Sequence, residues 1–103
     1  GLVERAARLG HLAMTRLRDA LREHPKVGDI RGRGLMIGVE IVTDRDTRQP
    51  DPDRAERIYY ACLEKGLSFK ISAGNVLTLS PPLTISEDDL MRAMDIVVGA
   101  IAA

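Results

Sequence analysis

The chain has 103 residues, with fifteen basic and fifteen acidic side chains, 45% hydrophobic residues and only 3% aromatic ones. This length is typical of one domain with a single core and leaves no room for a catalytic domain beside a substrate domain. The balanced charge and the few aromatic side chains argue against nucleic-acid binding, which needs a basic surface or a stacking platform.

The chain opens with apolar residues at three- and four-residue steps over residues 2–24, which predict an amphipathic helix. Pro25 ends this helix, because the residue before a proline is pushed out of helical geometry. No capping residue precedes the helix, as is usual for a segment cut from a longer chain.

Residues 27–42 are predicted to be extended. Within this segment the apolar residues Leu35, Ile37, Val39 and Ile41 occupy every second position, which is typical of a strand. The glycines of the segment 32–34 predict a turn or a bulge there, and so either two short pairing strands or one sharply bent strand. The polar segment 43–50 is expected to be an exposed loop.

A second helix starts at Asp51 and Pro52, a capping side chain followed by a residue suited to the first helical turn. Gly66 supplies its stop. Its apolar face is predicted to consist of Ala55, Ile58, Tyr59, Cys62 and Leu63.

Alternation over residues 66–71 and 75–80 predicts a hairpin of two strands around residues 72–74. Ser86, with Asp89 three residues later, resembles a capping box, and Ile85 is placed to pack on Leu90 across the first turn. The final helix carries an apolar stripe of Leu90, Met94, Val97 and Ile101.

This order of elements predicts one α+β domain over residues 1–103. The economical arrangement is a small, mostly antiparallel sheet of three to four strands with its helices packed on one face.

The sequence alone offers no self-contained catalytic constellation. The acids cluster in loops, as expected of solvated residues, and His11 and His24 have no partners at metal-ligand spacing. Cys62 lies on an apolar helix face, where a buried, inert thiol is expected rather than a nucleophile. A lone cysteine, without a signal peptide or a membrane span, favours a cytoplasmic protein.

The glycines invite a phosphate-loop interpretation that fails. After Gly32 and Gly34 the dinucleotide fingerprint requires glycine at position 37, where Ile37 stands, and no Gly-Lys-Ser/Thr sequence occurs. Arg31 and Arg33 remain candidates for binding an anion beside the turn, the alternative being that both face solvent.

Two segments carry a resemblance to a known family. VGDIRGRGLMIGVEI (27–41) and GNVLTLSPPLTISEDDL (74–90) resemble signature stretches of the C-terminal small domain of class III, fold-type I, pyridoxal-phosphate aminotransferases. The shared pattern is R-G-x-G-L, then G-x-E, a helix, a strand ending in P-P-L and a capped last helix, and it covers nearly the whole chain.

The resemblance implies pyridoxal 5'-phosphate as cofactor, bound by a large domain that these 103 residues lack. Lys26, Lys65 and Lys70 do not substitute for the family's Schiff-base lysine, since each lies beside a helix terminus or a strand edge. We therefore expect no catalytic, cofactor-binding or metal-binding residues in this chain, which should be inactive by itself.

The resemblance also points to Thr78 as the one substrate-binding candidate. Many members that act on α-amino acids place an arginine at this position, in the strand before P-P-L, to clamp the substrate carboxylate. A threonine hydroxyl can hydrogen-bond a carboxylate but cannot neutralise it. This departure favours an ω-amino acid or an amine as substrate, unless Thr78 is merely a strand residue.

The resulting hypothesis is the C-terminal part of an aminotransferase, a homodimer when complete, that uses an amine or amino acid and a keto acid. The alternatives are a racemase, epimerase or decarboxylase of the same superfamily, or a free-standing α+β module that binds small molecules. The aminotransferase hypothesis predicts an exposed apolar patch on the first helix or around residues 76–83, where the large domain docks.

Overall fold

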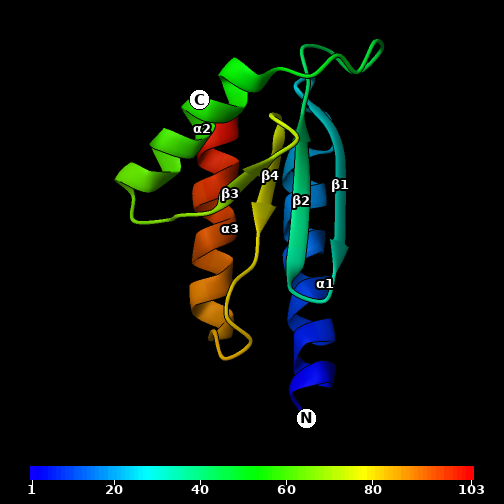
Figure 1. Cartoon of the computed structure of the whole chain (residues 1–103). Coiled ribbons are helices and arrows are strands. Elements are labelled where there is room, and N and C mark those ends of the chain that lie inside the picture. Colours follow the sequence, from blue (N-terminus) through cyan, green and yellow to red (C-terminus); the bar gives the residue numbers. More distant parts are fainter.

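The computed structural model describes all 103 residues and shows an α+β fold (Figure 1). The elements are α1 (Leu2–Leu21), β1 (Val27–Arg33), β2 (Met36–Ile41), α2 (Pro52–Glu64), β3 (Lys70–Ser72), β4 (Val76–Leu79) and α3 (Glu87–Ala102). The strands form one antiparallel sheet in the order β1-β2-β4-β3. The predicted fold class and the number of strands are therefore confirmed.

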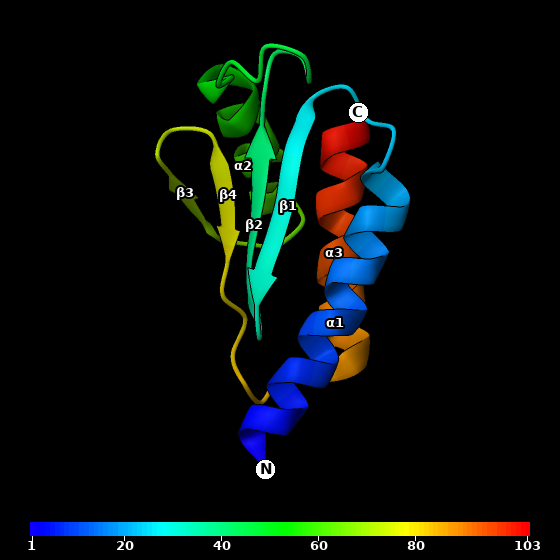
Figure 2. The same ribbon diagram turned by 90° about the vertical axis from the view of Figure 1, so that its right-hand side faces the viewer.

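The helices cover one face of this sheet, and the other face is open. Figure 2 shows α1 and α3 together on the same side of the strands. Alternate residues of β2 and β4, such as Ile37, Val39 and Leu77, are fully buried and join the apolar stripes of all three helices in one core. The intervening residues of β2, such as Met36 and Glu40, lie on the uncovered side, which we call the open face.

The segment 27–42 forms two strands, which resolves the alternative left by the sequence. β1 and β2 pair from Val27 with Ile41 to Arg33 with Met36, and Gly34 makes the turn with a φ of +57°. The ladder passes over Gly28, which leaves a bulge near the start of β1. None of the three helices combines the length and the hydrophobicity that a membrane-spanning helix requires.

The residues predicted to start and end α2 are confirmed, but the buried face of this helix is narrower than predicted. The Asp51 side chain accepts a hydrogen bond from the Arg54 N–H at 3.1 Å. Ala55, Ile58 and Cys62 are buried, whereas Leu63 is 44% exposed. α2 packs against α3 and against β2, β3 and β4, and only this one row of its side chains is buried.

The strand predicted over residues 66–71 is wrong for residues 66–69, since β3 begins at Lys70. The N–H groups of Gly66 and Leu67 donate to the carbonyls of Leu63 and Cys62 and close the end of α2. This backbone is committed to the helix cap, and pairing with β4 begins only at Lys70. The turn between β3 and β4 is confirmed, with positive φ values at Ala73 and Gly74.

α3 follows the prediction in its cap and its buried face. The Ser86 hydroxyl accepts from the Asp89 N–H at 3.1 Å, and the predicted stripe from Leu90 to Ile101 is buried. Ion pairs join α3 to α1 at Arg8–Glu87 (3.1 Å) and Arg16–Asp95 (2.7 Å). All four side chains are solvent-exposed, so these pairs contribute little beside the apolar contacts.

α1 also approaches the β1–β2 turn at backbone distance. A Cβ added at Gly10 would stand 1.9 Å from the carbonyl oxygen of Gly34, so the helix and the turn touch with no side chain between them. In α3, by contrast, a Cβ at Gly99 would meet nothing within 4 Å.

These two glycines make a matched pair of tests. We expect Gly10→Ala to lower the free energy of unfolding by roughly 1–3 kcal/mol, because the helix and the turn must move apart. Gly99→Ala should raise it by at most about 1 kcal/mol, because alanine costs less backbone entropy in a helix. Urea denaturation of both variants measures the difference, and equal effects would contradict the close packing.

Candidate functional site

The open face centres on Thr78, the predicted substrate-binding residue. The strand register aligns Arg31 of β1, Gly38 of β2, Thr78 of β4 and Lys70 of β3 in a single row across the sheet. Thr78 and Gly38 occupy the middle of this row, and the two cations lie on the edge strands. The small central residues leave a shallow groove of about 430 Å³ on the open face.

The Thr78 side chain is half-buried and already has a partner. Its hydroxyl donates a hydrogen bond to the Ser72 hydroxyl of β3 at 2.9 Å. The Thr78 oxygen keeps acceptor capacity, and the pair can exchange donor and acceptor roles because both hydroxyls rotate. The site can therefore orient a polar group, but Thr78 supplies no fixed positive charge.

Carboxylates pair with Arg31 and Arg48 near the open face, whereas Lys70 and Arg33 form no ion pair. Arg31 pairs with Asp29 at 3.1 Å and lies 3.9 Å from Glu40, which in turn pairs with Arg48 at 3.2 Å. Arg33 lines the same groove and is exposed. Of the two arginines suggested for anion binding, Arg31 is thus held by carboxylates, and anion binding by Arg33 stays a prediction.

The lysines of this chain do not fit a pyridoxal-phosphate site. Lys26 donates from Nζ to the Thr43 carbonyl at 2.7 Å, whereas Lys65 and Lys70 are exposed at the end of α2 and on edge strand β3. A Schiff-base lysine is desolvated in an apolar pocket or placed beside another cation that activates it. None of the three has such a surrounding, so no step is assigned to the cofactor on these residues.

The two histidines lie in different surroundings, one exposed on a helix and one hydrogen-bonded to the main chain. His11 is exposed on α1, and the His24 Nδ1 accepts a hydrogen bond from the Lys26 N–H at 3.1 Å. Burial lowers the pKa of His24, and the nearby Arg54 acts in the same direction. The structure brings no three His, Cys, Asp or Glu side chains together around a common point.

An apolar groove lies beside the open face, at the start of α1. Its exposed members are Leu2, Val3, Met36 and Leu83, and the groove measures about 500 Å³. The sequence predicted a patch on the first helix or around residues 76–83, and the structure brings both segments together. The participation of Met36 could not be foreseen, because it depends on the approach of the β1–β2 turn to α1.

Sequence reasoning also missed the partners of Thr78. The strand register places Gly38 directly opposite Thr78 and Arg31 opposite Gly38, and Ser72 meets Thr78 through the hydrogen bond between their hydroxyls. The consecutive turn residues Ala73 and Gly74 were the one local signal for this register, since a tight turn fixes which residues of its strands face each other.

Comparison with known proteins gives consistent matches over the chain. Residues 1–101 match the model of the family described as aminotransferase class-III. The chain is 54% identical over 80 residues to the (R)-1-hydroxy-2-aminoethylphosphonate ammonia-lyase of Vibrio splendidus, covering 78% of this chain and 17% of that protein. It is 43% identical to the leucine/methionine racemase of Thermococcus litoralis, covering 98% of this chain and 23% of the racemase.

A solved structure agrees with these matches. The crystal structure of a Bacillus anthracis aminotransferase superposes with a TM-score of 0.90 at 41% identity, over 98% of this chain and 24% of that one. The chain thus spans about a quarter or less of the length of the proteins it matches.

The surroundings of Cys62 generate a prediction for its reactivity. Burial in the core raises the pKa of the Cys62 thiol to about 11, so at pH 7.5 almost none of it is the reactive thiolate. We expect the folded chain to react with iodoacetamide at least about a hundredfold more slowly than the chain in urea. Mass spectrometry measures both rates, and comparable rates would show that Cys62 is accessible in the fold.

Proposed function

Because the chain belongs to the class III aminotransferase family, we propose that it is the C-terminal small domain of a pyridoxal-phosphate-dependent aminotransferase. The proposed reaction transfers an amino group between an amine or amino acid and a keto acid. Pyridoxal phosphate would supply the electron sink for this chemistry, held by residues outside these 103. The close superposition on an aminotransferase over 98% of the chain carries the proposal.

In this proposal the open face forms one wall of the substrate site. Thr78 and Ser72 orient the substrate through their hydroxyls, and Gly38 leaves room beside them. A neutral hydroxyl pair suits an amine, or an ω-amino acid whose carboxylate lies elsewhere, better than an α-carboxylate. We therefore propose the substrate class from the absence of a positive charge at position 78.

A second candidate is a racemase or lyase reaction, favoured by the 43% and 54% identity to proteins with those names. The two candidates differ in their need for an amino acceptor. An aminotransferase consumes a single amino-acid enantiomer only when a keto acid is present. A racemase produces the opposite enantiomer, and a lyase releases ammonia, without one.

We further propose that the rest of the parent chain covers the apolar groove of Leu2, Val3, Met36 and Leu83. Large exposed apolar patches mark contact surfaces in folded proteins. A homodimeric, cytoplasmic parent enzyme with small amines and keto acids as its partners completes the proposal.

Substitution of Thr78 tests the substrate assignment in the parent enzyme. A charge-assisted arginine–carboxylate contact contributes about 1.5–3 kcal/mol, so Thr78→Arg should raise kcat/KM for α-amino acids relative to amines by roughly 10- to 100-fold. Thr84→Arg is the control, since Thr84 is exposed in the loop before α3. An unchanged ratio in Thr78→Arg would remove position 78 from the substrate site.

Methionine oxidation tests whether the apolar groove is covered. Met36 is 59% exposed in this chain, whereas Met94 is 1% exposed and serves as an internal control. Hydrogen peroxide should oxidise Met36 at least about tenfold faster than Met94 in the isolated chain, because oxidation follows exposure. In the parent protein Met36 should become as slow as Met94, and rapid oxidation there would mean that nothing covers the groove.

A further inference from the structure

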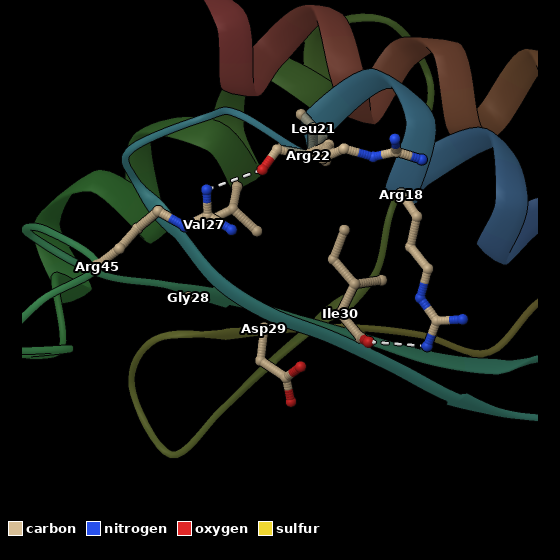
Figure 3. Close-up of a pocket in the computed structure, with 8 residues that line it drawn as sticks. All are labelled: Arg18, Leu21, Arg22, Val27, Gly28, Asp29, Ile30 and Arg45. Carbon is tan, nitrogen blue, oxygen red and sulfur yellow. Dashed lines mark hydrogen bonds between the residues drawn. The ribbon is translucent and has the colours of Figure 1, made fainter.

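A groove on the opposite side of β1 from its partner strand gathers three arginines. It lies between the C-terminal end of α1 and the outer edge of β1 and measures about 360 Å³ (Figure 3). Arg18 and Arg22 come from the end of α1, and Arg45 comes from the loop that follows β2. The apolar side chains of Leu21, Val27 and Ile30 also line the groove. None of these residues belongs to the open-face row that contains Thr78.

Two of the arginines are held in place by single hydrogen bonds to main-chain carbonyls. Arg45 donates to the Arg22 carbonyl at 2.8 Å, and Arg18 donates to the Ile30 carbonyl at 3.3 Å. Figure 3 shows their guanidinium groups at opposite ends of the groove. A guanidinium carries five N–H donors, so each keeps most of its donors for a ligand.

Positive charge exceeds negative charge at this groove. Asp29 is the one acid in its lining, and its carboxylate pairs with Arg31 at 3.1 Å. Arg22 pairs with Asp19 at 3.3 Å, but both side chains are more than 60% exposed and the contact is weak. Arg18 and Arg22 stand four residues apart on α1, a spacing at which like charges repel. The C-terminal dipole of the helix offsets part of this repulsion.

The main chain beside the groove departs from regular strand pairing at Gly28. The ladder between β1 and β2 passes over Gly28, which lines the groove as the extra residue of a bulge. Such a residue lacks a ladder partner.

We propose that this groove binds a small anion of the phosphate class, either inorganic phosphate or a phosphate ester. Forked guanidinium donors match the oxygens of a phosphate group. Arg18 and Arg45 would approach the ligand from the two ends of the groove. The volume lies at the lower end of the range of about 300–1,000 Å³ for small-molecule sites. The proposal is independent of the aminotransferase reaction.

A titration of the 103-residue chain followed by ¹H–¹⁵N NMR tests this site, with sodium chloride holding the ionic strength constant. Inorganic phosphate and glycerol 3-phosphate are the two probes, and the tighter of them tells whether the free ion or an ester is preferred. We expect saturable shifts of the Val27, Gly28 and Asp29 amides. Shifts that never saturate, or that spread evenly over the surface, would overturn the proposal.

Matched variants separate a built site from general attraction to positive charge. Arg18→Gln and Arg45→Gln should each weaken phosphate binding about tenfold or more, since each removes a charge-assisted contact. Arg57→Gln removes a charge from the exposed surface of α2 and should leave binding unchanged. Should a glutamine variant lose its dispersed spectrum, Arg45→Lys keeps the charge without the fork and should bind less tightly than the original chain. Equal binding by the original chain and the folded Arg18 and Arg45 variants would leave an adventitious ion only.

Discussion

The contact on which the structure depends is the backbone approach of α1 to the β1–β2 hairpin. Because Gly10 has no side chain, the Gly34 carbonyl can contact the backbone of α1 at this position. One helical turn further along, the sulfur of Met14 lies 2.8 Å from the position that a Cβ at Gly32 would occupy. These glycines let the hairpin lie directly on the helix, with Leu35 and Ile37 buried beneath it. The orientation of β2, and with it that of β4, follows from this contact.

The orientation of β2 then determines the chemistry of the open face. Side chains alternate between the two faces of a strand, so burial of Ile37, Val39 and Leu77 places Gly38 and Thr78 on the uncovered side. A slip of one residue in the pairing would exchange the two sets and bury Thr78 in the core. The apolar core thus fixes the position of the substrate-site candidate without contacting any substrate.

The fold was predictable where the signals were local, and it was missed where they were tertiary. Apolar spacing gave all three helices, and Asp51, Gly66 and Ser86 gave their boundaries. The predictions of a buried Leu63 and of a strand at residues 66–69 were wrong. Helix packing determines the exposure of Leu63, and the cap of α2 determines the backbone conformation at Gly66 and Leu67. Thr78 was found only by resemblance to a family. The arginine groove could not be predicted from local signals, since Arg45 joins it from more than twenty positions beyond Arg22.

The distribution of charge separates the two faces of the edge strand β1. On the open face, Asp29 and Glu40 pair with Arg31 and Arg48, whereas Lys70 and Arg33 have no carboxylate partner. At the outer edge of the same strand, Arg18 and Arg45 use only carbonyl partners and keep their charge. Because surface charges are screened over about 10 Å, the charge that an anion meets in the edge groove is set mainly by the three arginines that line it. In the proposed substrate site, Thr78 itself would contribute only a neutral hydrogen bond, whereas an arginine at this position would add a fixed charge.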